Sequence, residues 1–369
     1  MEVAVITRHA IANYGSLLQA TATQNALETL GHNCRIIDYV RPGEVCTQLH
    51  KSQLQQKPRW NRTPLRRRVY STLCYTENVM AGRLFESARR QMLHLTAPYS
   101  TAQELTANGP KADVYMTGSD QVWGPMEDGS YDPVYRLTFA PEGAKKVAYA
   151  ASFGSTELSK PLRGQFCRDL RQYASITVRE DSAIALLHQL GLDGKQVIDP
   201  VFLPDDAFWQ SLLEPINAAP GSYFLVYQMR KDPALCAYAK AAAKAAGKPL
   251  LRLSASVHQA TWGGKFIYAP TPGQFLHYIK NAACVITDSF HGTAFSLRFG
   301  VPFAEVLPTN CTGTCNHSLL TLTGLQSRLV TDPADTALTA TPINYAPVHK
   351  KIETARTASL SLLREMIEK

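Results

Sequence analysis

The densest group of residues able to do chemistry follows a short apolar run at 284–287. That run stops at the segment 288–293, with the sequence DSFHGT, and a helix is expected to follow. A strand that passes into a helix brings together backbone N–H groups and the positive end of a helix dipole, where a phosphate or carboxylate can bind. His291 could transfer a proton there near neutral pH. The plainer interpretation is that Ser289 only caps the helix and His291 packs beside it.

Two further segments offer groups that could bind anions and sugars. Arg179 ends an apolar run, and its planar guanidinium suits bidentate contact with phosphate or carboxylate. An ion pair with Asp181 or a neighbouring acid is the alternative for this arginine. In the segment 118–123, Asp120 could accept a hydrogen bond from a sugar hydroxyl, and Trp123 could stack on the face of a sugar ring. A plain turn explains that segment equally well.

These segments lie at the ends of strand-like runs that alternate with helical ones, a pattern typical of an α/β fold. The first helix is expected to open at Ser16, with Gln19 completing a capping box, and to end at Gly31. A strand, a helix and a second strand in so short a span imply a parallel, right-handed crossover. Strands are predicted at 1–7, 34–39, 113–117, 146–151, 176–180, 196–198, 223–228, 250–253, 284–287 and 301–307, and further helices at 161–173, 181–190, 233–247, 272–283, up to 299, and 349–369.

The length of 369 residues predicts two domains at a nominal ~150 residues each. Two βαβ-type lobes around a cleft are the natural packing for this order of elements, and such a cleft places ligands at the carboxyl ends of the strands. Prolines and acids just after residue 199 mark a linker. The predicted division is a first lobe at 1–203 with a basic insertion at about 42–110, a second lobe at 204–345 and a C-terminal helix at 346–369.

The composition is that of a folded protein, with 45% hydrophobic and 18% charged residues. The net charge of +8 suits anionic substrates or a membrane surface and does not demand nucleic acid. Between Lys51 and Arg68 the chain carries seven basic residues and Trp60, but no acid. A solvated basic loop is one explanation of this stretch. Contact with an anionic lipid or a diphosphate is another, and nucleic acid is a third.

Several classes of protein are disfavoured. No apolar run reaches the ~18 residues that span a bilayer, and the N-terminus lacks the pattern of a signal peptide. The eight cysteines lie mostly in apolar stretches, as expected of reduced thiols in a cytosolic protein. Cys311, Cys315 and His317 supply only three irregularly spaced ligands, so no metal site is expected. The motifs of dinucleotide enzymes, P-loop NTPases, zincins and α/β-hydrolases are not found.

Five short segments occur in an order and spacing that match a known family. They are 13–20 (NYGSLLQA), 118–123 (GSDQVW), 149–154 (YAASFG), 177–180 (TVRE) and 287–293 (TDSFHGT). With them the chain resembles the polysaccharide pyruvyl transferase family from its N-terminus to about residue 330. The resemblance implies a GT-B-like fold of two Rossmann-like lobes with a cleft between them and a C-terminal helix that returns to the first lobe. It also implies phosphoenolpyruvate as donor and a sugar diol as acceptor, giving a cyclic pyruvate ketal and phosphate.

Residue by residue, the resemblance makes His291 the catalytic histidine, acting as general acid, and Arg179 the donor-binding arginine. Members with known donor chemistry usually have an arginine two residues before that histidine, where this chain has Ser289. The candidates to replace that cation are Arg8, Arg230 and Arg298. The remaining expectations are that Asp120 orients an acceptor hydroxyl, that Ser289, Gly292 and Thr293 of the second lobe bind the donor, and that Asn13, Tyr14 and Trp123 bind the acceptor.

The expected function is therefore pyruvyl transfer to a sugar or lipid-linked glycan, a precursor of exopolysaccharide or capsule. Phosphoenolpyruvate is a co-substrate, and neither a cofactor nor a nucleic acid partner is expected. A cytoplasmic location, with peripheral contact at the inner face of an anionic membrane, fits the basic composition. One alternative is a GT-B glycosyltransferase using a sugar nucleotide, although no acid is evident after Gly292 to hold a ribose. The other is a non-catalytic glycan- or lipid-binding relative, which Ser289 keeps open.

Overall fold

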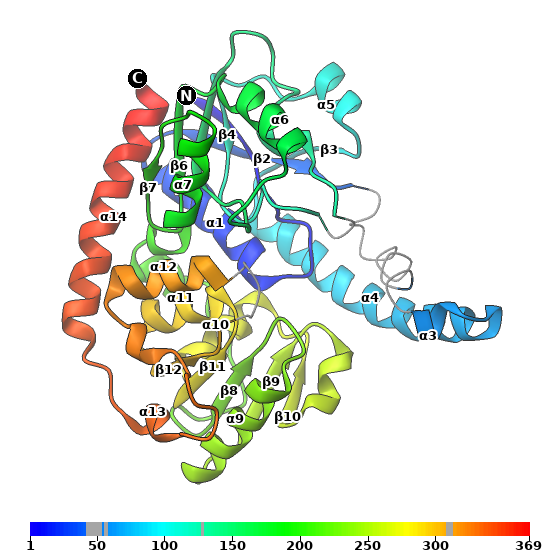
Figure 1. Cartoon of the computed structure of the whole chain (residues 1–369), viewed down its shortest axis with the longest axis vertical. Helices are drawn as coiled ribbons and strands as arrows, with labels where there is room; N and C mark the ends of the chain where they lie inside the picture. Colours follow the sequence, from blue (N-terminus) through cyan, green and yellow to red (C-terminus); the bar gives the residue numbers. More distant parts are fainter. Residues whose placement is uncertain (42–53, 55–57, 127–128, 308–312) are drawn as a thin grey trace. The chain divides into compact units, whose positions relative to one another are not determined.

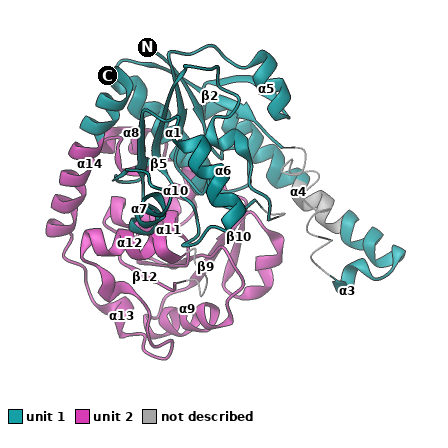
Figure 2. Cartoon of the chain, turned by 45° about the horizontal axis from the view of Figure 1, so that its top comes forward, with its two compact units in different colours: residues 1–200, 360–369 teal, residues 201–359 magenta. Residues whose placement is uncertain are grey.

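The computed structural model describes residues 1–41, 54, 58–126, 129–307 and 313–369, without the side chains of 73–78 (Figure 1). The chain divides into two compact units. Unit 1 comprises residues 1–200 and 360–369, and unit 2 comprises residues 201–359 (Figure 2). No helix among the described residues is both long enough and apolar enough to cross a bilayer. Each unit is built on its own parallel sheet.

The sheet of unit 1 has seven strands, all parallel, in the order β3-β2-β1-β4-β5-β6-β7. Its central strands are short runs of apolar residues, such as VYMT in β4, that are buried throughout, as a parallel sheet covered on both faces requires. The strands are β1 (Glu2–Ile6), β2 (Asn33–Tyr39), β3 (Leu95–Tyr99), β4 (Val114–Thr117), β5 (Lys145–Ala151), β6 (Ser175–Val178) and β7 (Lys195–Gln196).

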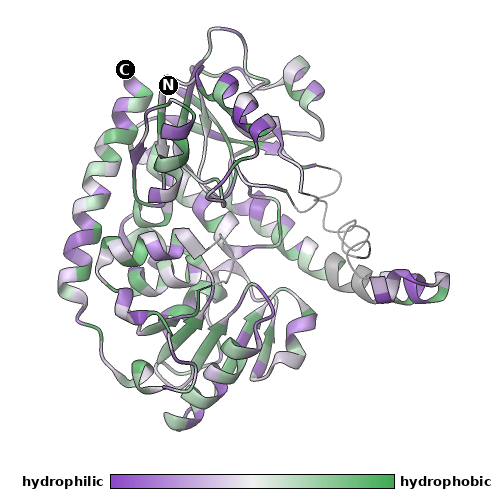
Figure 3. Cartoon of the chain, in the orientation of Figure 1, coloured by the Kyte–Doolittle hydropathy of each residue, from purple (hydrophilic) through white to green (hydrophobic). Residues whose placement is uncertain are grey.

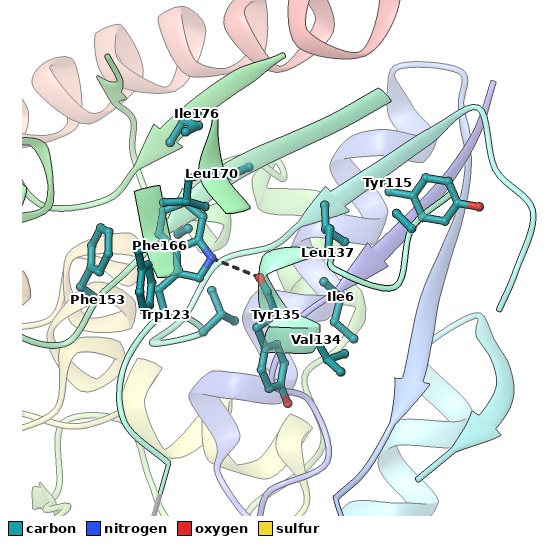
Figure 4. Close-up of a cluster of buried hydrophobic side chains, with 14 of the residues drawn as sticks. Ile6, Tyr115, Trp123, Val134, Tyr135, Leu137, Phe153, Phe166, Leu170 and Ile176 are labelled. Carbon is teal, nitrogen blue, oxygen red and sulfur yellow. Dashed lines mark hydrogen bonds between the residues drawn. The ribbon is translucent and has the colours of Figure 1, made fainter. Parts of the chain in front are cut away.

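Helices connect these strands. Below one face lies a core of aromatic and aliphatic side chains, in which the Trp123 ring packs 5.1 Å from the Phe153 ring (Figure 4). The helices of unit 1 are α1 (Tyr14–Thr29), α3 (Pro58–Asn61), α4 (Pro64–Met92), α5 (Ala102–Asn108), α6 (Lys160–Leu170) and α7 (Asp181–Gln189), with a 3-10 turn at Pro133–Arg136.

The sheet of unit 2 has five parallel strands in the order β10-β9-β8-β11-β12. Figure 3 shows these strands as hydrophobic, and the core between them and α9 is lined by alanine and aromatic side chains. The strands are β8 (Phe224–Tyr227), β9 (Leu250–Ser254), β10 (Lys265–Tyr268), β11 (Cys284–Thr287) and β12 (Phe303–Glu305). The helices are α8 (Asp206–Ser211), α9 (Pro233–Ala245), α10 (Pro272–Lys280), α11 (Phe290–Phe299), α12 (Thr314–Thr323), α13 (Ala337–Ala340) and most of α14 (Tyr345–Glu368).

Two predictions from the sequence differ from the structure. The first helix does not open at Ser16, because Asn13 is its N-cap and the Asn13 side chain accepts hydrogen bonds from the backbone of Gly15 and Ser16. The segment 42–110 is not wholly an insertion either. Its last part forms β3, which pairs with β2 at the edge of the sheet, and α5. The parallel α/β architecture itself is confirmed.

Candidate functional site

Both sheets share one strand order, in which the first strand of each unit lies in the middle beside the fourth: β1 next to β4, and β8 next to β11. At this point the chain connections leave in opposite directions, and open α/β sheets bind ligands at the carboxyl ends of such strands. The residues singled out from the sequence follow these strands. Asn13 comes after β1, Asp120 after β4, and the segment 288–293 after β11. Each unit therefore contributes polar groups at its own switch point.

In unit 2, the turn from β11 into α11 is held by hydroxyl groups. Ser289 is the N-cap, and its Oγ accepts a hydrogen bond from Gly292 N at 3.4 Å. The Thr287 hydroxyl accepts from Ser289 N at 3.0 Å and donates to the carbonyl of Tyr227 on the neighbouring strand at 2.6 Å. The capping role that the sequence left open for Ser289 is thus present. It also fixes the orientation of the first turn of α11.

Gly292 is required by the close approach of this turn to its own strand. A Cβ atom at residue 292 would lie 2.4 Å from Thr287 Oγ1 and 3.0 Å from Thr287 Cβ. Only glycine lets the backbone of the first helical turn come so near the end of β11. The backbone N–H groups of that turn are consequently placed directly beyond the strand, where the helix dipole favours an anion.

Asp288 joins this turn to the loop after β8. Its Oδ1 accepts a hydrogen bond from Met229 N at 2.6 Å, and its Oδ2 accepts one from Arg230 N at 3.2 Å. Burial raises the pKa of this carboxyl, while the backbone hydrogen bonds and the positive charge of Arg230 act in the opposite direction. The exposed Arg230 is therefore held beside the N-terminal end of α11.

Three buried polar side chains, which the sequence interpretation missed, shape that same loop. Gln228 Nε2 donates to the carbonyl of Arg230 at 2.7 Å, and its Oε1 accepts from Arg252 Nη1 at 2.7 Å. Gln259 Nε2 donates to the carbonyl of Gln228 at 2.8 Å. The guanidinium of Arg252 also donates to Gly263 O at 2.8 Å. The only signal in the sequence was an arginine inside an otherwise apolar strand, LLRLS.

His291 lies in the first turn of α11 and is 6% exposed, with its ring 5.2 Å from that of Phe290. Thr293 is fully buried instead, and its hydroxyl donates to the carboxyl of Glu305 at the end of β12. Asn316 donates to the other oxygen of the same carboxyl. The Thr293 hydroxyl is directed into the interior of unit 2, so it is not available to a donor and we do not include it in the proposed site.

In unit 1, Asp120 stands at the end of β4 with a positive φ of 80°. Its Oδ1 accepts a hydrogen bond from Gln121 N at 2.8 Å, and its Oδ2 accepts one from the hydroxyl of Ser16. The first turn of α1 and the end of β4 thus meet at this carboxylate. The side chain is mostly buried, which limits the directions from which a ligand can approach it.

Arg179 lies among three carboxylates of unit 1. Its guanidinium nitrogens are 3.2 Å from Asp199, 3.6 Å from Asp120 and 3.7 Å from Glu180. Asp199 also accepts a hydrogen bond from the Ser119 hydroxyl at 3.0 Å. The neighbouring-acid pairing that the sequence left as an alternative is therefore realised with Glu180, Asp120 and Asp199. The guanidinium holds Asp120 in place.

The three residues expected to contact the acceptor differ in their exposure to solvent. Trp123 is 1% exposed, and its Nε1 donates to the carbonyl of Tyr135 at 3.1 Å inside the core, so its face is not open to a sugar (Figure 4). Tyr14 is equally buried, with its ring 4.8 Å from that of Phe85. Only Asn13 remains partly exposed, as the N-cap of α1.

The three arginines considered as replacements for the missing family arginine lie in different places within their own units. Arg298 is in the last turn of α11, where it donates to Pro204 O at 2.9 Å and pairs with Asp206 at 2.8 Å. Arg8 follows β1 in unit 1. Of the two in unit 2, Arg230 is the one at the N-terminal end of α11. As for metals, the described residues contain no cluster of three or more His, Cys, Asp or Glu suited to an ion, and Cys311 lies outside the described residues.

The GT-B-like fold is also seen in solved structures. The UDP-GlcNAc 2-epimerase of Neisseria meningitidis, solved with UDP-GlcNAc bound, is 9% identical with a TM-score of 0.51, and the alignment covers 99% of both chains. The putative UDP-N-acetylglucosamine 2-epimerase of Listeria monocytogenes is 12% identical with a TM-score of 0.50, and the alignment covers 100% of this chain and 96% of that one. No curated protein matches the chain. At sequence level, however, residues 13–308 match the polysaccharide pyruvyl transferase family, a stretch that includes all five motifs, and the chain accordingly belongs to that family.

Proposed function

We propose that this chain transfers the pyruvyl group of phosphoenolpyruvate to two hydroxyls of a sugar, forming a cyclic ketal on a precursor of a surface polysaccharide. Membership of the family supports the reaction class. The observation that carries the proposal is the position of His291 in the first turn of α11, next to the Asp288-held loop that presents Arg230. An imidazole, a helix N-terminus and an exposed arginine thus occur together in unit 2.

The donor end of the proposed site is the N-terminal turn of α11. Phosphoenolpyruvate carries a phosphate and a carboxylate, and both are anions of the kind that helix N-termini bind. Ser289 and Gly292 set the direction of the backbone N–H groups there. Arg230 supplies the positive charge that other members of the family place two residues before the histidine.

The reaction requires one proton to be added to carbon and one phosphate to leave. In the proposed sequence, His291 protonates the methylene carbon of phosphoenolpyruvate, which creates positive character on the carbon that bears the phosphate. The first sugar hydroxyl bonds to that carbon, the C–O bond to phosphate breaks, and the second hydroxyl closes the ring. Of the two hydroxyl protons released, one replaces the proton given by the histidine and the other leaves with phosphate.

The acceptor end of the proposal belongs to unit 1. Asp120 can accept a hydrogen bond from a sugar hydroxyl and so increase its nucleophilicity, while Ser16 and Arg179 keep the carboxylate in position. Asn13 is the second proposed acceptor contact. In this scheme Arg179 is a positioning residue, since three carboxylates already surround its guanidinium.

The test is to incubate the protein with phosphoenolpyruvate and a panel of sugars and lipid-linked glycans. Turnover should release phosphate and add about 70 Da to the acceptor, the mass of pyruvate less water. His291→Gln should lower kcat by roughly 10^2- to 10^4-fold while donor binding persists. Arg230→Gln should chiefly raise KM for the donor, whereas the neighbouring exposed Lys231→Gln should leave it unchanged.

A melting assay, together with the same panel of acceptors, separates the alternative functions. Stabilisation by a UDP-sugar and not by phosphoenolpyruvate in a melting assay would replace the proposal with glycosyl transfer, since a ligand of the native state raises Tm. Binding without turnover across the panel would indicate a non-catalytic relative. Full activity of His291→Gln would remove the histidine from the proton-donor role.

Arg179→Gln tests the positioning role. The change leaves buried Asp199 and Glu180 without their counter-charge, so we expect a loss of about 3–5 kcal/mol in the free energy of unfolding. Arg171→Gln, at an exposed position of the same unit, should stay within about 0.5 kcal/mol of the parent. If Arg179 instead contacts the donor, KM for phosphoenolpyruvate will rise more than kcat falls.

A further inference from the structure

Helix α3 and the first nine residues of α4 form a basic helical arm in unit 1, defined here as residues 58–72. α4 is a 29-residue helix. Its C-terminal half is anchored in unit 1 through buried side chains, with Phe85 against Tyr14 and Arg89 paired with Asp38. Residues 64–72, at its N-terminal end, carry mostly exposed side chains, and Figure 1 shows α3 at that end of the helix. The arm is therefore held at one end and open at the other.

The arm has an ordered internal structure. The Trp60 ring lies 5.7 Å from the Tyr70 ring, which is buried beneath it. Arg67 Nε donates to Asn61 O at 2.8 Å, and the Thr63 hydroxyl caps α4 by accepting from Arg66 N. These contacts fold α3 back onto α4 and fix which side chains face outward.

Apolar side chains are exposed along one face of α4. Leu65 is 73% exposed, Val69 43% and Met80 57%, and their spacing places them on the same side of the helix. Exposed Arg83 lies on the same side of the helix, about 27 Å from Leu65 along the axis at 1.5 Å per residue. Leaving such side chains in water costs free energy, and large exposed apolar patches mark interaction surfaces.

Positive charge surrounds this face. Arg59, Arg62, Arg66, Arg67 and Arg68 are all exposed, and in the described part of the chain none of the five pairs with a carboxylate. The sequence contains no acid from residue 51 to 76. Figure 3 shows the resulting mixture of hydrophilic and hydrophobic residues over α3 and the start of α4. A helix with an apolar face and arginines at its flanks is typical of segments that lie in the interface of an anionic bilayer.

We propose that the basic helical arm docks on an anionic phospholipid surface. Leu65 and Val69 of the arm, and Met80 further along α4, enter the interface, and the arginines contact phosphate headgroups. Charge complementarity argues for an anionic surface, and the exposed aliphatic side chains argue for lipid over nucleic acid, which offers no apolar layer to receive them. The inference does not depend on the proposed reaction. A membrane contact and pyruvyl transfer can each fail without the other.

The experiment is co-sedimentation of the full chain with vesicles of phosphatidylcholine alone or with about 30% phosphatidylglycerol, with circular dichroism to verify folding of each variant. The parent should bind the anionic vesicles and not the neutral ones, more weakly as salt rises. Replacing Arg59, Arg62 and Arg68 by Gln should weaken partition by about 100-fold, because each charge near the surface contributes about a factor of five. These three are chosen because Arg66 and Arg67 also contact the backbone of the arm.

Two matched variants decide the outcome. Leu65→Gln with Met80→Gln keeps every charge and should weaken partition by about tenfold. Lys240, Lys244 and Lys265 are exposed in unit 2, and their replacement by Gln removes the same charge but should leave partition unchanged. Equal binding to neutral vesicles, or an unaffected Leu65/Met80 variant, would overturn the proposal. The latter result, together with tight binding of single-stranded RNA, would assign the arm to nucleic acid.

Discussion

At the scale of single residues, the most unusual group in unit 2 is the carboxyl of Glu305, fully buried at the end of β12. Burial raises its pKa to about 8, and the hydrogen bonds from Thr293 and Asn316 only partly oppose this. The residue lies behind the first turn of α11, because Thr293 belongs to that turn. Its protonation state therefore concerns the stability of the element that presents His291.

The sign of the resulting pH dependence follows from linkage. Unfolded, this glutamate ionises near 4.5, whereas in the folded protein it keeps its proton up to about pH 8. Between these values the native state binds more protons, so its contribution to stability is complete below pH 4.5 and is lost as pH rises through 8. Glu305→Gln removes the titration. The free energy of unfolding of the variant minus that of the parent should therefore increase as pH rises from 5 to 8, by on the order of several kcal/mol.

The measurement is urea unfolding of both proteins across this pH range. Comparing the two at each pH cancels the titration of all other groups. A stability difference that stays constant from pH 5 to 8 would show that Glu305 is ionised in the folded protein. Thr323→Ser, at another buried threonine of unit 2, serves as a control whose difference from the parent should not vary with pH.

Residue identity alone predicted the site only in part. The polar turn after β11 was found because five polar or glycine residues interrupt an apolar run, a local feature of the sequence. The roles of Trp123 and Thr293 were not predictable, because a tryptophan beside a turn and a threonine in a first helical turn face inward or outward according to tertiary packing. Arg230 was identifiable only as one cation among three, and the hydrogen bond from its backbone to Asp288 distinguishes it.

At the scale of elements, the start of α1 links helix formation to the geometry of Asp120. Both Asn13 and Ser16 are residues that cap helices well, and Ser16 has Gln19 three positions later. The sequence therefore favoured Ser16 as the N-cap of α1. In the structure the helix begins one turn earlier, which frees the Ser16 hydroxyl to donate to Asp120. Gln19 meanwhile donates to the Thr7 hydroxyl at 2.8 Å at the end of β1.

Asn13→Ala should therefore destabilise unit 1 by about 1 kcal/mol, because the backbone N–H groups of Gly15 and Ser16 lose their acceptor. Asn13→Asp preserves an oxygen in the same place and should remain close to the parent. Unfolding by urea measures both. If Ser16 were the true N-cap, Asn13→Ala would have the same stability as the parent, and so would Asn13→Asp. Ser16→Ala would then be the variant that lowers stability.

The strands were predicted more reliably than the helices around the site, for a physical reason. A strand buried on both faces of a parallel sheet is a continuous apolar run, which local sequence reveals. Strand β10 (KFIY) and helix α12 (TCNHSLLTLT) carry no such signal, because β10 is a short edge strand and α12 mixes small polar and apolar residues. Their existence depends on the neighbours that they pack against.

At the scale of the whole molecule, unit 1 contains residues from both ends of the chain. Residues 360–369 group with unit 1, whereas the earlier part of α14 belongs to unit 2. Lys145, the first residue of β5, donates from its Nζ to Ile367 O at 2.8 Å, and His32 lies 3.7 Å from Glu368. Leu363 and Ile367 are fully buried in this last part of α14. The final helix turns are thus part of the core of unit 1.

Replacing Leu363 and Ile367 by Ala should therefore destabilise unit 1, although both residues lie more than 150 positions after its last strand ends at Gln196. Each truncation of a buried aliphatic side chain costs about 2–5 kcal/mol. Calorimetry can follow the two units separately where they unfold in distinct steps, and hydrogen exchange of β1 and β5 gives a local readout. The exposed neighbours Ser361 and Arg364, changed to Ala, provide the control on the same helix. Slow exchange preserved in β1 and β5 of the double variant would mean that unit 1 is complete without the end of α14; faster exchange there, with unit 2 unaffected, would establish that the last helix turns complete its core.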